Sequence, residues 1–261
     1  SISMLLFCLL FATSFLLGQS PVRVASAASP PMPCGDIDEL IKAINDANAN
    51  PLAETIITLT PGCTYQLTGP HNTDEGANGL PSITSPITIN GNGATIARAT
   101  ASPTPPFRIF RVSSTGKLTL NNLTVRNGSL LSSSKTTNQV VVTGGAILNS
   151  GGTLTVNNSV ISNNVTVGQK AAGGAIQNSG AATTTITNSS ISRNSATFGG
   201  AIAGTGTTTI LSSTLSLNTA SQDGGALSIG AAAVTIVNST ISGNTATSNG
   251  GGIGIDTASA P

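Results

Sequence analysis

The chain has 261 residues, only 7% of them charged, and its formal net charge at pH 7 is +1. Such a small net charge provides no electrostatic field for a nucleic acid, so nucleic-acid binding is excluded. With nine acidic residues and one histidine, the chain also has few groups for acid–base or metal chemistry.

Residues 1–28 are predicted to be a signal peptide. The apolar run from Met4 to Gly18 is too short to span a bilayer, and small residues follow it up to Ala28. Cleavage is expected after Ala27 or Ala28. We therefore expect a secreted protein, extracellular or on the cell surface at an outer membrane or cell wall, with no transmembrane segment after signal removal.

Two cysteines, Cys34 and Cys63, remain after signal removal, in a chain bound for an oxidising compartment. We expect them to form a disulfide. The alternative is a metal-binding or catalytic thiol, but His71 is the only histidine and no ligand cluster accompanies it. We therefore expect no metal site and no cofactor.

Residues 29–68 are predicted to form an N-terminal cap, made of an α-helix, a first strand and the disulfide. Asp36 followed three residues later by Glu39 is a helix-capping pair, and Pro51 ends the helix. One helix face is apolar: Ile37, Leu40, Ile41 and Ile44. A solenoid needs such a cover over its first coil. The first strand is expected at Ile56 to Leu59.

Residues 69–261 are predicted to form the main body of a single domain. Gly69 to Ser85 and Ser129 to Asn138 have the composition of surface loops, whereas Ile87 to Gly91 and Leu118 to Asn122 resemble the later strands. The chain stops at Pro261 inside a coil. We therefore expect a truncated C-terminal end, in a monomer or in a chain that associates end to end through this uncapped coil.

A repeated unit organises the second half of the chain. Gly-Gly pairs begin the units at positions 144, 173, 199, 224 and 250, which are steps of 29, 26, 25 and 26 residues. The following sets of apolar residues align between units: Ile147/Ile176/Ile202/Leu227, Val156/Ile186/Ile210/Ile236 and Ile161/Ile191/Leu215/Ile241. Short period-two segments of this kind predict an all-β, right-handed parallel β-helix of about seven coils, with three strands per coil.

Two further sets of aligned residues are expected at the corners of the coils. An asparagine follows three residues after an inward Ile or Leu in each unit, which gives the column Asn164, Asn194, Asn218 and Asn244. Stacked asparagines can accommodate a left-handed turn and hydrogen-bond along the stack. The glycine pairs can supply positive φ angles at the opposite corner. We interpret both sets as structural, with ligand binding as the alternative.

The paired motifs resemble a known family. Gly-Gly-Ala-Ile at residues 144–147, combined with Ile161-x-x-Asn164, resembles the repeat of polymorphic outer-membrane proteins, a family of surface-exposed, autotransported adhesins. The resemblance covers roughly residues 144–253, and it extends more broadly to secreted bacterial right-handed β-helix proteins. It implies a structural or adhesive role, with a surface glycan or a protein of a host or neighbouring cell as partner.

A polysaccharide lyase or hydrolase of the pectin-lyase-like type is the alternative function. Such enzymes need paired carboxylates, or an acidic calcium cluster beside a basic residue. From Gly76 onward the only acidic residues are Asp223 and Asp256, and before them Asp74 and Glu75 are adjacent in a predicted loop. We therefore expect no catalytic residues in the repeats and predict that the chain is not an enzyme.

Threonines form the most regular exposed pattern. One column contains Thr88, Thr119, Thr155, Thr185, Thr209 and Thr235, and a shorter one contains Thr153, Thr183 and Thr207. Strand alternation places both on one outer face. Flat Thr-x-Thr arrays resemble ice-binding solenoids, which gives a second alternative function. Threonine is also simply a good residue for an exposed strand.

Neither the aromatic nor the basic residues form an obvious binding surface. The aromatic residues after the signal peptide are scattered and are expected in the core or in loops: Tyr65, Phe107, Phe110 and Phe198. Arg98, Arg108 and Arg111 could gather on one side of the early coils and bind an anionic glycan. The alternative is that these arginines are simply solvated.

Overall fold

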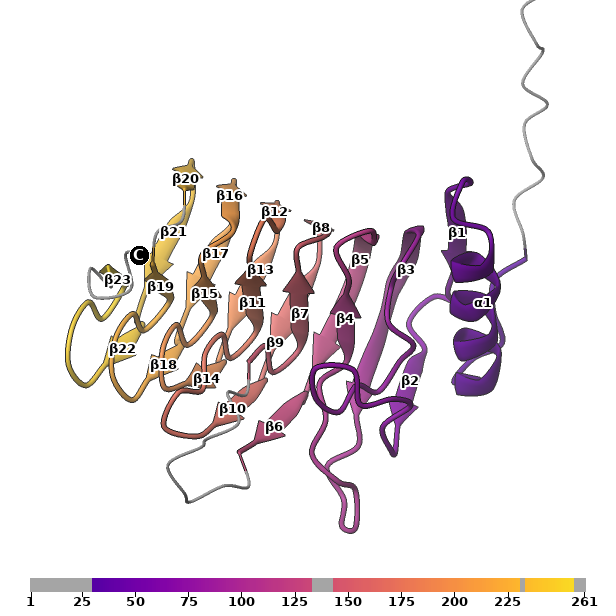
Figure 1. Ribbon diagram of the computed structural model, residues 1–261, viewed down its shortest axis with the longest axis horizontal. Coiled ribbons are helices and arrows are strands. Elements are labelled where there is room, and N and C mark those ends of the chain that lie inside the picture. The colour runs from indigo at the N-terminus through magenta and orange to yellow at the C-terminus, as the bar shows by residue number, and fades with distance from the viewer. Residues whose placement is uncertain (1–29, 133–142, 231–232, 256–261) are drawn as a thin grey trace, which may run out of the picture.

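The computed structural model describes residues 30–132, 143–230 and 233–255. Their strands form three curled sheets, and within each sheet the strands of successive coils stack along one axis (Figure 1). Within these ranges every strand is paired in parallel with its neighbours, and the isolated bridge between Asn72 and Asn78 is antiparallel. The coils follow one another from α1 (Ile37–Ala49) and β1 at one end to β23 at the other. The predicted signal peptide, residues 1–28, lies outside the described residues.

The largest sheet bends at a corner and so has two arms. In the described residues, seven strands stack in the first arm: β1 (Thr55–Thr58), the first half of β3 (Pro86–Arg98), the first half of β5 (Lys117–Arg126), β8 (Thr153–Asn157), β12 (Thr183–Thr187), β16 (Thr207–Leu211) and β20 (Val234–Val237). The second arm contains β2 (Thr64–Leu67), the second halves of β3 and β5, β9 (Val160–Ser162), β13 (Ser190–Ser192), β17 (Thr214–Ser216) and β21 (Thr240–Ser242).

Two smaller sheets complete each coil. The five-stranded sheet contains β6 (Ser129–Leu131), β10 (Val165–Val167), β14 (Ser195–Ala196), β18 (Thr219–Ala220) and β22 (Thr245–Ala246). The six-stranded sheet contains β4 (Phe110–Val112), β7 (Ile147–Ser150), β11 (Ile176–Ser179), β15 (Ile202–Gly204), β19 (Leu227–Ile229) and β23 (Ile253–Ile255). A complete coil such as β7 to β10 therefore has four short strands, not the three expected from the sequence.

The predicted apolar columns are confirmed in full. Each set of aligned residues is paired in register from coil to coil, for example Ile161 with Ile191 and Ile191 with Leu215. Most of these side chains are fully buried in one continuous core. Burial of an apolar surface stabilises by roughly 25 cal/mol per Å², so each coil is held mainly by its neighbours.

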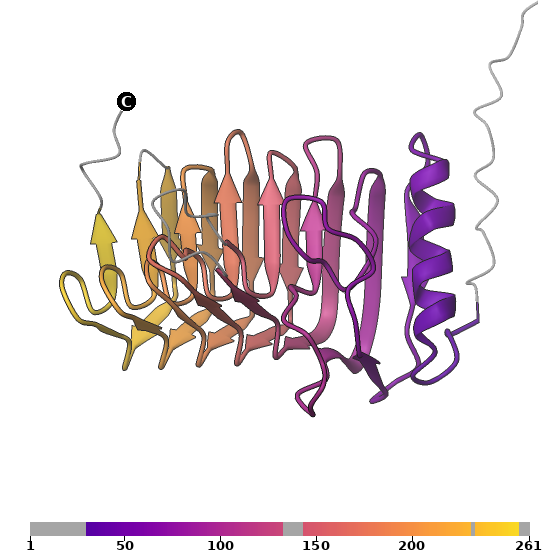
Figure 2. The ribbon, with the colours of Figure 1, turned by 60° about the horizontal axis from the view of Figure 1, so that its bottom comes forward.

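The helix forms as predicted and lies against the first coil. The Asp36 side chain accepts a hydrogen bond from the Glu39 N–H at 2.9 Å, which caps the helix N-terminus. Leu40 and Ile44 are fully buried in the same core as Ile57 and Leu59. The apolar face of α1 thus closes the end of the core next to β1 and β2 (Figure 2).

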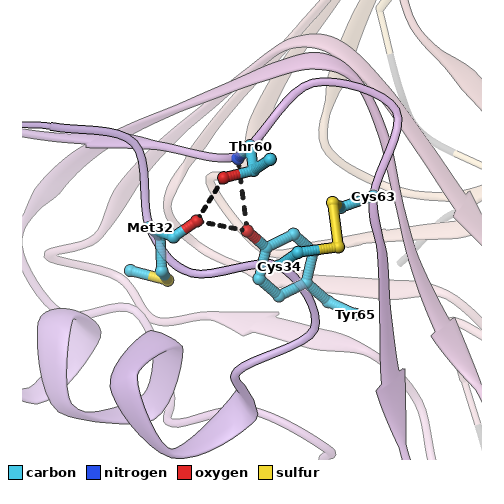
Figure 3. The surroundings of a disulfide bond; sticks show 5 residues. All are labelled: Met32, Cys34, Thr60, Cys63 and Tyr65. Atoms are coloured by element: carbon cyan, nitrogen blue, oxygen red, sulfur yellow. Dashed lines mark hydrogen bonds between the residues drawn. A yellow bond between two sulfur atoms is a disulfide. The ribbon is translucent and has the colours of Figure 1, made fainter.

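A disulfide joins the chain before α1 to the turn before β2. Cys34 and Cys63 are bonded, with their Cα atoms 5.5 Å apart (Figure 3). Beside them the Met32 carbonyl accepts hydrogen bonds from the hydroxyls of Thr60, at 2.5 Å, and Tyr65, at 3.0 Å. The buried Tyr65 and the disulfide together fix the N-terminal segment to the first coil.

The two predicted loops need correction. Within Gly69 to Ser85, the second half returns to the stack, because Asn78 pairs with Arg108 and Ile83 pairs with Val112. Buried residues of this segment, such as Leu80, are part of the core, which sequence polarity alone does not reveal. In the second predicted loop, Ser129–Leu131 is strand β6, and residues 133–138 lie outside the described residues.

Glycine pairs form one corner of the coils, and the two positions of a pair require glycine for different reasons. The first glycine has a positive φ as predicted, for example 69° at Gly144 and 63° at Gly173. The second approaches the backbone of the next coil, since a Cβ on Gly145 would lie 2.3 Å from the Gly174 oxygen. Any side chain there would push two coils apart.

The asparagine column forms a buried ladder at another corner. Asn194 donates from both its backbone N–H and its Nδ2 to Asn218 Oδ1, at 3.0 Å each, and Asn164 binds Asn194 in the same way. The left-handed residue is not the asparagine itself but the one before it: Asn163, Arg193, Leu217 and Gly243. The asparagine after each left-handed residue donates its backbone N–H to the next asparagine of the ladder, and this hydrogen bond stabilises the strained corner.

A serine ladder repeats the same arrangement five residues earlier. Ser189 N–H donates to Ser213 Oγ at 3.1 Å, and Ser159 and Ser213 bind the next serine along the stack in the same way. The preceding residues are again left-handed, for example Asn188 at φ 49° and Ser212 at φ 48°. These corners separate β8 from β9 and β12 from β13. The strand that the sequence analysis did not predict is the short one after the asparagine corner, such as β10 or β14.

We predict that Asn218→Ala lowers the free energy of unfolding by about 3 kcal/mol, because it leaves buried hydrogen-bonding groups on Asn194 and Ile191 unpaired. Urea unfolding followed by circular dichroism measures this change. Asn157→Ala is the matched control, since Asn157 is half-buried and donates one side-chain bond, to Asn121 Oδ1. Equal losses in the two variants would contradict a special role for the buried ladder.

Candidate functional site

The threonine columns lie on the outer face of the first arm, in register. Thr119, Thr155, Thr185, Thr209 and Thr235 are direct neighbours on successive strands, and Thr88 precedes them. The shorter column, Thr153, Thr183 and Thr207, is also in register and exposed. Hydroxyls therefore repeat at roughly 4.8 Å across the strands.

Other residues limit the extent of this threonine face. Thr88 donates to Glu54 Oε1 at 2.7 Å and is almost buried. Lys117 occupies the shorter column beside Thr153, and a hollow of about 310 Å³ lies there between Glu54, Lys117 and Thr155. A continuous two-column array therefore spans only β8, β12 and β16.

Three of the four carboxylates singled out in the sequence each have a partner of their own. Asp74 Oδ2 accepts from the Ser82 hydroxyl at 2.8 Å, and Glu75 binds Arg111 Nε at 2.7 Å. Asp223 Oδ1 accepts from both the backbone and the side chain of Asn249 at 2.9 Å. Asp256 lies outside the described residues. Asp74 and Glu75 thus fix a loop to the stack, and Asp223 links two coils.

The three arginines do not form an exposed cationic cluster, so that prediction is wrong. Arg108 is 1% exposed and donates to Asn78 Oδ1, to the Glu75 carbonyl and to the Thr143 carbonyl, at 2.9 to 3.0 Å. Burial lowers the pKa of Arg108 to about 10. Arg98 donates to the Asn127 carbonyl, and burial lowers its pKa as well. Sequence spacing did not reveal that Arg108 points inward.

The aromatic residues divide into two groups. Tyr65, Phe107 and Phe110 are fully buried, and Arg98 lies over the Phe107 ring at 6.0 Å from its centroid. Phe198 differs because it is half-buried beside an open groove that Gln177 also lines. Sequence analysis missed this pair, since neither residue recurs in the neighbouring units.

The described residues contain no group of three or more His, Cys, Asp or Glu side chains placed to hold a metal ion. In that part of the chain there is also no helix with the length and apolar character that a membrane crossing requires. The chain matches no protein-family model, no curated protein and no solved structure. Its function must therefore be argued from its own surfaces.

Arg108→Ala is expected to lower the free energy of unfolding by about 3 kcal/mol, because three acceptors that now bind one buried guanidinium would lose it. Chemical denaturation gives the difference directly. The control is Arg126→Ala, since Arg126 is exposed on β5 and should change stability by less than about 0.5 kcal/mol. A loss at Arg108 no larger than at Arg126 would refute this role.

Proposed function

We propose that this chain is an exported right-handed parallel β-helix that serves as a structural and adhesive module, extracellular or on the cell surface. The right-handed sense follows from the general rule that about 98% of crossovers between parallel strands turn that way. The Cys34–Cys63 disulfide supports export, because such bonds persist mainly in oxidising compartments. The expected partner is a surface glycan or a protein of a host or neighbouring cell.

The observation that carries this proposal is where the polar side chains of the described residues lie and what they bind. Asparagine and serine oxygens hold the corners, whereas threonine hydroxyls cover the outer face of the first arm. Asp74, Glu75 and Asp223 are each bound to separate partners. A hydrolase or lyase would need convergent carboxylates or an acidic calcium site. This distribution favours a rigid module that presents surfaces over an enzyme of the pectin-lyase-like type.

The test is a binding screen of the exported chain against glycans, polysaccharides and cell-surface proteins, with release of soluble products measured on the same samples. We expect binding without bond cleavage. Chain with the disulfide reduced and then unfolded is the negative control. Cleavage would overturn the proposal, and Asp74, Glu75 and Asp223 would then be the first residues to replace. Absence of binding to every class would equally contradict an adhesive role.

Ice binding is a second candidate, favoured by the register of the threonine columns. The pairs Thr153/Thr155, Thr183/Thr185 and Thr207/Thr209 face outward on three adjacent strands. Neighbouring threonines within a pair lie about 6.8 Å apart along the strand. The array would order water only over this small area.

If this second function holds, Thr185→Lys should reduce inhibition of ice recrystallisation at least about fivefold, because a long charged side chain disrupts the flat array. Inhibition is measured as ice-grain growth in an annealed sucrose film. Thr214→Lys on β17 is the control, since it places the same charge on the second arm. Equal activity of both variants and the parent would reject ice binding.

A further inference from the structure

An open groove runs along the outer side of the six-stranded sheet, away from the threonine face. Its floor is the outward column Gln177, Ala203 and Ser228, which are paired in register on β11, β15 and β19. These strands lie side by side in the stack (Figure 1). Phe198 and Ala172 form one wall, and Gly204, Thr205 and Gly230 form the other. The groove has a volume of about 190 Å³.

The backbone fixes the shape of this groove. Phe198 pairs with Ala172 on the neighbouring coil, and its carbonyl accepts from Gly173 N–H at 2.9 Å. Opposite, Gly204 has φ 138°, and a Cβ there would collide with the Asn178 carbonyl. One coil earlier, Leu148 fills the floor position that Gln177 occupies. The hollow therefore results from small residues on a rigid frame.

Gln177 is unusual on this floor. Its side chain is 9% exposed, and its buried Oε1 has no hydrogen-bond partner in the structure. Its Nε2 has only two contacts, at 3.5 Å, the outer limit for a hydrogen bond. Buried polar groups are normally paired, and an unpaired one requires an explanation, such as strain or a functional role. An apolar residue fits the same column at Leu148 and Ala203.

We propose that this groove binds one neutral N-acetylhexosamine unit of a glycan. Gln177 Oε1 is covered in this structure, so the side-chain amide would turn toward the groove on binding and accept from the acetamido N–H. The acetyl methyl would contact Ala203. The apolar face of the sugar ring would lie against Phe198, and the hydroxyls of Ser228 and Thr205 would bind ring hydroxyls. This inference rests on the proposed adhesive function and names the ligand class for one site.

Charge and size support this choice of ligand. Among the residues that the structure describes, no charged side chain lines the groove, so none of them would offset the charge of a uronic acid or a sulfated sugar. The groove is smaller than the roughly 300–1,000 Å³ pockets that enclose drug-sized molecules. It therefore fits a single ring of a longer chain, and a weak Kd on the order of 1 mM is expected for one unit.

The experiment titrates the exported chain with short oligosaccharides of N-acetylglucosamine and of N-acetylgalactosamine, followed by calorimetry or NMR. Oligomers of unsubstituted glucose and of galacturonic acid are the comparison ligands. We expect at least one N-acetylated series to bind about tenfold more tightly than both comparisons. Phe198→Ala should weaken that binding about tenfold. Gln177→Leu should remove the preference for the acetamido group, because Leu accepts no hydrogen bond.

Control variants distinguish binding at the Gln177 groove from the proposed adhesive function of the whole chain. Gln177→Leu is expected to fold, since Leu148 occupies the same column, and circular dichroism checks this. Gln66→Leu on β2 is the matched control and should bind like the parent. Binding of the N-acetylated sugars that survives both groove substitutions would overturn the site. Tight binding of the chain to a protein or an acidic glycan alone would overturn the ligand but leave the adhesive function standing.

Discussion

The structure depends on one repeated hydrogen bond at the corners of its coils. A residue with a left-handed backbone turns the chain, and the next residue's N–H then points along the stack axis, where a side-chain oxygen of the following coil accepts it. Asn218 does this for Asn194, and Ser213 does it for Ser189. Since the donor and the acceptor belong to different coils, neither corner is satisfied by a single coil alone.

This constraint explains the order seen elsewhere in the fold. Corners that repeat in register keep the intervening strands in register, so the inward residues form continuous apolar columns and the outward residues form continuous threonine columns. The glycine pairs serve the same end by allowing close contact, as at Gly145 against Gly174. Each coil therefore stabilises its neighbours, and the helix α1 covers the first one.

Features that recur in the sequence were predictable, and unique features were not. The columns through Ile161 and Val156, the positive φ of Gly144 and the cap at Asp36 all follow from spacing and residue type. The fourth strand of each coil was missed because it has only two or three residues, and its buried positions hold Thr166, Ala196 and Ala220, which form no column of large apolar residues. The return of the chain at Asn78 to Ile83 depends on pairing with a distant segment, which no local pattern encodes.

The same distinction applies to the surfaces. The register of Thr155 and Thr185 follows from strand alternation, whereas the burial of Arg108 depends on acceptors from two segments distant from it, residues 75–78 and Thr143. Gln177 and Phe198 meet only because two neighbouring coils carry different residues at exposed positions. A search for repeated motifs overlooks such residues, because they occur at positions where the repeat is irregular.

The left-handed corner before the asparagine ladder accommodates very different side chains. Its four aligned positions carry an amide, a guanidinium, an isobutyl group and no side chain at all, in Asn163, Arg193, Leu217 and Gly243, and all are exposed. The asparagine ladder beneath them holds the corner whichever side chain precedes it. A single substitution in this row can therefore change the surface chemistry of one coil while the shape of the stack stays the same.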